Sequence, residues 1–112
     1  MIDPFAVHLN LEAGTLSPVP ERVVCRLSNL HGLVYDEQLL VRELARGDPI
    51  IYEVLKLAIP QEQGHLFVNI TFLKPGKIGR EYYFTKGHFH INEQAAEVYL
   101  GLRGQGVVVL HK

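Results

Sequence analysis

Apolar residues alternate with polar or small residues along several short stretches of this chain. Alternation with a period of two is typical of β-strands that bury one face. In residues 65–73, one face of such a strand is entirely apolar, whereas Asn69 and Thr71 lie on the other. The pattern predicts strands at residues 5–11, 23–27, 50–59, 65–73, 81–85, 97–102 and 107–110.

One segment carries the signals of a helix instead. Asp36 is a favourable N-cap, and the leucines after it recur at helical spacing as far as Gly47. The Asp48-Pro49 pair then prevents the helix from continuing. Many short strands with one short helix near the N-terminus predict an all-β fold, either a barrel or a sandwich.

Composition limits the classes of protein that fit. The chain has 112 residues, of which 47% are hydrophobic and 21% charged, as expected for one soluble domain. Its net charge of −1 predicts neither a nucleic-acid nor a membrane partner. Cys25 is the only cysteine, so no intrachain disulfide can form. The start, MIDPFAVHLN, does not resemble a secretory signal, and we expect a cytoplasmic protein.

Candidate chemistry gathers around a His-x-His pair. On an extended segment, His88 and His90 point the same way. Glu97 follows after one loop, and its spacing predicts that it shares a side with Tyr99. Two imidazoles and a carboxylate suit Fe2+, Mn2+, Ni2+ or Zn2+. Such a pair alone is also typical of two ordinary polar residues on a loop. Gly87 and Gly104, together with the following Glu97, favour a metal site.

The spacing of these residues resembles the first motif of the cupin superfamily. Here the motif consists of His88 and His90, six residues, Glu97, six residues and Gly104. The spacer is longer than in most cupins, and Tyr82 stands where a glycine is usual. The run PGKIGREYYFTKGHFH, residues 75–90, resembles the cupin-type glucose-6-phosphate isomerases of archaea and some bacteria. Further similarity lies in residues 4–7, 26–28 and 48–54.

This resemblance implies a fold and a domain organisation. It covers the chain from 1 to 112 and implies a single cupin domain, a jelly-roll-like β-barrel or sandwich. The chain would carry an N-terminal extension and the first cupin motif. Family members continue through a second motif with another histidine ligand, which is absent from this sequence. The cupin would then be incomplete at its C-terminus. The family also forms homodimers, and association would relieve an unpaired sheet edge here.

The resemblance also assigns roles to individual residues. It implies a metal bound by His88, His90 and Glu97, with Fe2+ expected first. The residues it implies for contact with the sugar phosphate are Thr71, Thr85 and Gly87, and those for lining the pocket are Tyr52 and Tyr99. Taken alone, each threonine also suits a strand and each tyrosine a core.

The implied activity is interconversion of glucose 6-phosphate and fructose 6-phosphate, a step of glycolysis and gluconeogenesis. Glu97 is expected to be the catalytic base if a proton is transferred. If Glu97 is a permanent ligand, a metal-assisted hydride shift is the alternative. Two other functions stay open: a non-catalytic cupin that binds metal or sugar phosphate, and an inactive fragment of the isomerase.

Overall fold

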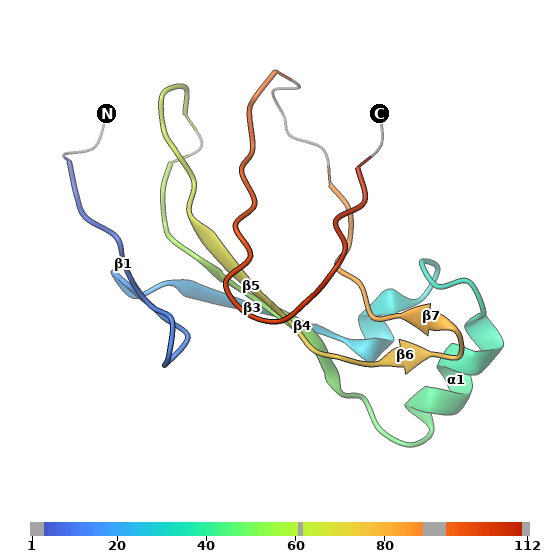
Figure 1. The fold of residues 1–112 in the computed structure, drawn as a ribbon. Coiled ribbons are helices and arrows are strands. Elements are labelled where there is room, and N and C mark those ends of the chain that lie inside the picture. Colours follow the sequence, from blue (N-terminus) through green and yellow to red (C-terminus); the bar gives the residue numbers. More distant parts are fainter. Residues whose placement is uncertain (1–3, 61, 89–93, 111–112) are drawn as a thin grey trace.

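The computed structural model describes residues 4–60, 62–88 and 94–110, and shows a β-rich chain with one α-helix (Figure 1). Its strands, in chain order, are β1 (His8–Asn10), β2 (Thr15–Ser17), β3 (Glu21–Arg26), β4 (Ile50–Lys56), β5 (Asn69–Leu73), β6 (Lys77–Ile78) and β7 (Glu81–Tyr82). Between β3 and β4 lie the 3-10 helix η1 (Leu27–Leu30) and the helix α1 (Glu37–Leu44). Within these ranges no closed barrel forms, and no helix is long and apolar enough to cross a membrane.

A three-stranded antiparallel sheet, in the order β3-β4-β5, forms the centre of the molecule. Its register places Cys25 opposite Tyr52, and the pairing shifts between Cys25 and Arg26, where η1 is about to begin. Across β3 and β4, the Arg22 guanidinium donates to both carboxylate oxygens of Glu53, at 2.7 and 3.0 Å. This pairing holds the pKa of Glu53 below its ordinary value.

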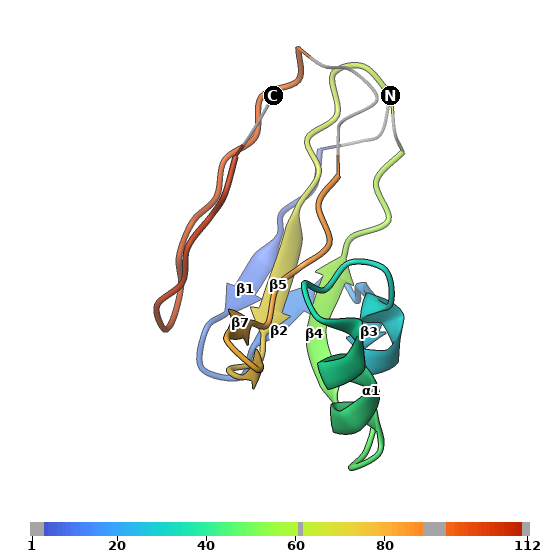
Figure 2. The same cartoon turned by 90° about the vertical axis from the view of Figure 1, so that its right-hand side faces the viewer.

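The hydrophobic core lies at one end of this sheet, where η1 packs against β3, and α1 packs against η1 and β6 (Figure 2). The buried residues of the core are Cys25, Leu27, Leu30, Leu40, Ile51 and Ile78. Leu40 is the one fully buried residue of α1, as expected for an amphipathic helix that turns a single face inward. Burial of these side chains is what holds the helices to the sheet.

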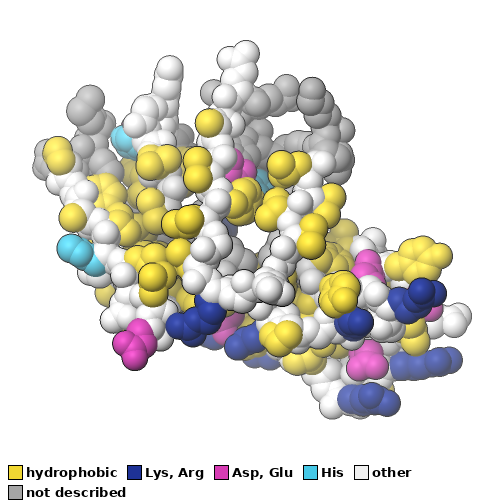
Figure 3. Space-filling model, viewed as in Figure 1, with side chains coloured by type: hydrophobic (Ala, Val, Ile, Leu, Met, Phe, Trp, Pro, Cys, Tyr) yellow, Lys and Arg dark blue, Asp and Glu magenta, His cyan; other side chains and the backbone are white. Residues whose placement is uncertain are grey.

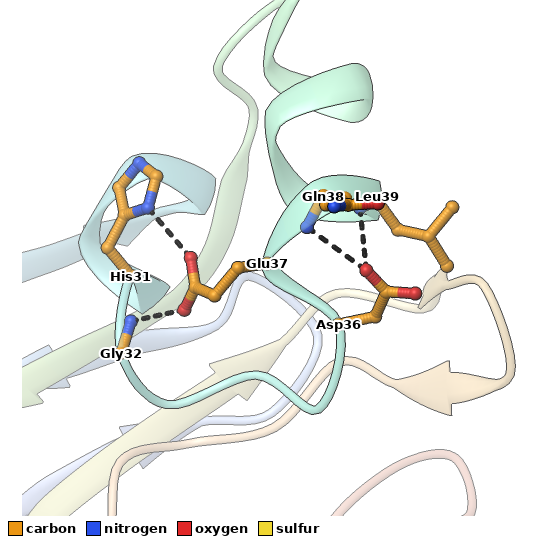
Figure 4. A network of polar contacts seen from close by, with 6 residues as sticks. All are labelled: His31, Gly32, Asp36, Glu37, Gln38 and Leu39. Carbon is orange, nitrogen blue, oxygen red and sulfur yellow. Dashed lines mark hydrogen bonds and ion pairs between the residues drawn. The ribbon is translucent and has the colours of Figure 1, made fainter.

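The start of α1 is fixed by two neighbouring carboxylates (Figure 4). Asp36 accepts hydrogen bonds from the backbone N–H groups of Gln38 and Leu39, at 3.0 and 3.1 Å. The Glu37 carboxylate instead contacts residues that precede the helix: it accepts the Gly32 N–H and hydrogen-bonds to the ring of His31. These two partners, Gly32 first, lower the pKa of Glu37. The predicted N-cap is therefore confirmed.

α1 ends at Leu44, earlier than the end at Gly47 that the sequence predicts, and a short polar loop then returns to the sheet. The Asp48 carboxylate accepts the Ser28 N–H at 2.8 Å and the Ser28 hydroxyl at 2.6 Å, which lowers the pKa of Asp48. The Leu27 N–H donates to the Pro49 carbonyl at 2.9 Å. The predicted stop at Asp48 and Pro49 thus also fastens η1 to the beginning of β4.

The last part of the chain consists of two extended arms joined by a turn at Arg103 and Gly104 (Figures 1 and 2). Gly104 has φ +79°, a conformation that favours glycine. Among the described residues 94–110 no strand is formed, so the strands predicted at 97–102 and 107–110 are wrong as paired elements. The alternating pattern produced the extended backbone, but a strand also needs a hydrogen-bonding neighbour.

Other predicted boundaries need smaller corrections. The strands expected at 5–11, 50–59, 65–73 and 81–85 all occur in shortened form. The strand expected at 23–27 begins earlier and gives way to η1 at Leu27. Sequence reasoning missed η1, β2 and β6 altogether. Pro75, Gly76 and Gly79 predict a loop over residues 74–80, but Lys77–Ile78 pairs with β7 there. Thr15–Ser17 pairs with β1 in a small hairpin, although Pro18 and Pro20 made this region look irregular.

Replacing Asp36 by alanine is expected to destabilise the chain by about 1 kcal/mol, because two N–H groups of α1 lose their acceptor. Urea denaturation followed by circular dichroism measures the change. Gln38→Ala is the matched control, since it keeps the backbone donor and changes only an exposed side chain. Equal stability of the two variants would contradict the capping role.

Candidate functional site

The residues singled out from the sequence come from four parts of the structure. Tyr52 lies in β4 and Thr71 in β5. The segment that follows β7 carries Thr85, Gly87 and His88, all three exposed. The first extended arm carries Glu97 and Tyr99. His90 lies outside the described residues.

The sheet register brings Tyr52 and Thr71 onto one face. In the pairing of β4 with β5, Thr71 lies directly opposite Val54. Tyr52 precedes Val54 by two residues, so the two side chains point to the same side of β4. Tyr52 and Thr71 are therefore diagonal neighbours on one face, a separation of about 7–8 Å between backbones. Side chains that line the same pocket must lie on the same face of the sheet, and Tyr52 and Thr71 meet this requirement.

Tyr52 links the sheet to the segment before His88. Its ring is half-buried and packs against the core, and its hydroxyl accepts the backbone N–H of Lys86 at 3.4 Å. Burial is the main cause that raises the pKa of Tyr52; the contact with Cys25 acts in the same direction, and the Lys86 N–H opposes both. The phenol stays protonated at neutral pH and serves as a hydrogen-bonding anchor for Lys86.

The segment that follows β7 is also held at its beginning, where Tyr83 lies close to the backbone of Gly76. The Tyr83 N–H donates to the Gly76 carbonyl at 2.9 Å. A Cβ at Gly76 would lie 2.3 Å from the Tyr83 ring, and Gly76 has φ +155°. Only glycine fits there. Sequence reasoning used Gly76 merely as a loop signal and missed this contact, as it missed the roles of Cys25 and the Lys86 amide.

Glu97 and Tyr99 interact directly on the first arm. A hydrogen bond between the two side chains raises the pKa of Tyr99, with burial and the negative charge of Glu97 as smaller causes. The protonated phenol is the donor and the carboxylate the acceptor. The shared side of these two residues, expected from their spacing on an extended segment, is confirmed by this contact.

The donors present suit a transition metal, although the described residues do not complete a ligand set. Imidazole and carboxylate are ligands that Fe2+, Mn2+, Ni2+ and Zn2+ accept. In residues 4–60, 62–88 and 94–110, no three His, Cys, Asp or Glu side chains cluster in a way that could hold a metal. Because His90 lies outside these ranges, the set of His88, His90 and Glu97 stays a prediction.

Two surface hollows lie away from these residues. One is an open hollow of about 400 Å³, lined by Leu27, Glu43, Arg46, Gly47, Asp48, Pro49 and Tyr83. The second is lined by Glu37, Gln38, Val41 and Arg42 on α1. Neither includes a residue predicted from the sequence for metal or sugar phosphate, so neither identifies the site.

Comparison with known proteins gives one consistent family. The sequence model described as Glucose-6-phosphate isomerase (GPI) matches residues 24–112. The glucose-6-phosphate isomerases of Thermococcus gammatolerans and Thermococcus kodakarensis are each 40% identical to this chain over 107 residues. The glucose-6-phosphate isomerase of Pyrococcus furiosus is 38% identical over 108 residues.

These matches are unequal in coverage. Each of the three takes in 96% of this chain, but only 56–57% of the relative. The chain therefore spans about half the length of the curated relatives it matches.

Replacing Tyr52 by phenylalanine is expected to speed amide hydrogen exchange at Lys86 about fivefold, because the Lys86 N–H loses its acceptor. Global stability should change little, since the ring still packs against the core. NMR-detected exchange measures both. Tyr35→Phe, at a side chain that is 94% exposed, is the control. An unchanged Lys86 rate in Tyr52→Phe would show that the phenol does not hold this segment.

Proposed function

This chain belongs to the glucose-6-phosphate isomerase family, and from that premise we propose that it carries a metal-dependent aldose–ketose isomerase site for glucose 6-phosphate and fructose 6-phosphate. The family match over residues 24–112 is the observation that carries the proposal. The Tyr52–Lys86 and Glu97–Tyr99 contacts support it, because they order the two segments from which the site would be built.

The proposal includes a cupin fold with residues 1–112 in one domain. Antiparallel strands, a single helix and an extended hairpin are compatible with a jelly-roll-like arrangement. We also propose a cytoplasmic homodimer, in accord with a reducing environment for the lone Cys25.

The metal ligands would be His88, His90 and Glu97, with Fe2+ as the first expectation and Mn2+, Ni2+ or Zn2+ as alternatives. When bound, the divalent metal polarises the sugar carbonyl and offsets the negative charge that develops beside it. The role of this chain would be to present the three donors to the metal.

Phosphate recognition would fall to the segment that Tyr52 anchors. The Lys86 N–H is already directed to the Tyr52 hydroxyl. The groups left for a phosphate are the Thr85 hydroxyl, the Lys86 ammonium and the Gly87 N–H. Thr71 would contact the sugar from the sheet face that it shares with Tyr52.

Glu97 would move a proton between the two carbons that exchange the carbonyl. In this version its carboxylate would be detached from the metal or only loosely bound to it. It would accept the proton from C2 of glucose 6-phosphate and return it to C1, while the hydroxyl proton passes from O2 to O1. Tyr99 would hold the carboxylate in one orientation through its hydroxyl. In the alternative, Glu97 is a permanent ligand and hydrogen passes directly between the carbons as hydride. Incorporation of solvent deuterium into the product distinguishes the two, since only proton transfer to a solvent-exchanging base introduces it.

His88→Ala is expected to lower metal-dependent isomerase activity about a hundredfold or more, because the metal loses an imidazole ligand. A coupled assay with fructose 6-phosphate on metal-loaded chain measures turnover, and metal analysis measures binding. His8→Ala is the control, because His8 is an exposed histidine on β1 that is not among the predicted ligands.

The same measurements separate the competing functions. Full activity of His88→Ala after exhaustive chelation would refute the proposed chemistry. Metal or fructose 6-phosphate binding by the unaltered chain without turnover would indicate a binding cupin. Neither binding nor turnover would indicate an inactive fragment.

A further inference from the structure

The segment that carries Thr85 and Gly87 continues directly from the short β6–β7 hairpin. Each of these two strands has two residues, and Ile78 pairs with Glu81 across them. A two-stranded hairpin of this size is not stable by itself, so contacts outside the hairpin must hold it. Ile78 supplies one such contact, because it is buried in the hydrophobic core.

Two further contacts tie the hairpin to the helical region. Gly79 at its tip has φ +63° and lies so close to α1 that a Cβ there would be 2.5 Å from the Leu39 side chain. On β7, the half-buried Glu81 carboxylate accepts the backbone N–H of Tyr35 at 2.9 Å. In the part of the chain that the structure describes, this is the only hydrogen bond between the hairpin and the helical region.

Tyr35 offers a fixed point, because carboxylates hold the loop on both sides of it (Figure 4). Before it, the Gly32 N–H donates to the Glu37 carboxylate. After it, Asp36 accepts two N–H groups of α1. The Tyr35 side chain is exposed, so the backbone of this residue and not its ring makes the link to Glu81.

Glu81 makes this link as a hydrogen-bond acceptor and not as a charge. Figure 3 shows Lys and Arg side chains beside Asp and Glu side chains where β6, β7 and α1 lie, so an ion pair would be the ordinary expectation. Among the described residues, however, Glu81 forms no ion pair. Lys77, on the paired strand, places its ammonium over the Tyr82 ring instead, 4.6 Å from the ring centroid. A neutral acceptor oxygen of the same reach would therefore serve equally well.

The tie at Glu81 bears on the segment that would bind phosphate. Residues 85–87 are exposed, so packing does not fix them. On one side, the Lys86 N–H is held by the sheet. On the other, the contact of Tyr83 with Gly76 closes the base of the hairpin, so it moves with the hairpin and does not anchor it. The anchor on that side is the attachment of β7 to the helical region.

We propose that Glu81 is a positioning residue for residues 85–87. By fixing β7 to the loop before α1, its carboxylate determines where the Thr85 hydroxyl and the Gly87 N–H lie for the phosphate. The effect on substrate rests on the proposed function, whereas the effect on the order of the segment does not. The two can therefore be tested apart.

Glu81→Ala is expected to speed amide hydrogen exchange about fivefold at Tyr35 and about threefold at Lys86, because β7 loses its tie. Glu81→Gln keeps an acceptor oxygen at the same reach and should leave both rates close to those of the unaltered chain. Glu81→Asp keeps the charge but is too short to reach Tyr35, so it should resemble Glu81→Ala. NMR measures the rates in variants that circular dichroism shows to be folded.

Asp48→Ala is the matched control. It also removes a carboxylate that accepts a backbone N–H, but its partner, Ser28, lies in η1 and not beside β7. An unchanged Lys86 rate in Glu81→Ala and Glu81→Asp would overturn the inference. An equal rise in Asp48→Ala, or a Glu81→Gln variant as fast as Glu81→Ala, would also overturn it.

Turnover separates this inference from the proposed function. In the coupled assay on metal-loaded chain, Glu81→Ala should raise KM for fructose 6-phosphate about fivefold with kcat nearly unchanged, because phosphate binding weakens while Glu97 is untouched. Asp48→Ala should leave KM unchanged. An active Glu81→Ala variant with unaltered KM would overturn the positioning role. Faster exchange at Lys86 in a chain without turnover would support that role and count against the proposed function instead.

Discussion

The pairing of β3 with β4 is the interaction on which the rest of the structure depends. Its register places Cys25 opposite Tyr52, and its irregularity after Cys25 ends the strand where η1 begins. The Leu27 N–H then bonds to the Pro49 carbonyl, so the beginning of β4 and the end of β3 are joined. Both helices lie between these two points in the chain. The pairing therefore brings them together and gives Leu40 a core to enter.

The same pairing reaches the candidate site through one side chain. Tyr52 is packed against the core from β4, and its hydroxyl meets the backbone immediately before Gly87 and His88. The segment is exposed, so this bond and the Tyr83–Gly76 contact supply the order that burial does not. Glu97 depends on a different arrangement, a local bond to Tyr99 on an extended arm. One half of the candidate site thus rests on the core, and the other on its own arm.

Local sequence signals correctly predicted the structural features that depend on neighbouring residues. Asp36 as N-cap, the stop at Asp48 and the common side of Glu97 and Tyr99 all follow from backbone geometry over a few positions. Family membership was also predictable, because it rests on a run of motif residues. The Tyr52–Lys86 contact was not, since it joins residues 34 positions apart. Its existence is decided by the strand register and not by any local pattern.

The arms show which structural features an alternating pattern predicts and which it does not. Alternation and β-branched valines favour an extended backbone, and the arms have one. Pairing depends on a neighbour, which the pattern does not specify. Val98 and Leu100 point to one side of the first arm, whereas Glu97 and Tyr99 point to the other. Any contact on the Val98 side of the first arm would therefore restrict the backbone that carries Glu97 without touching the carboxylate.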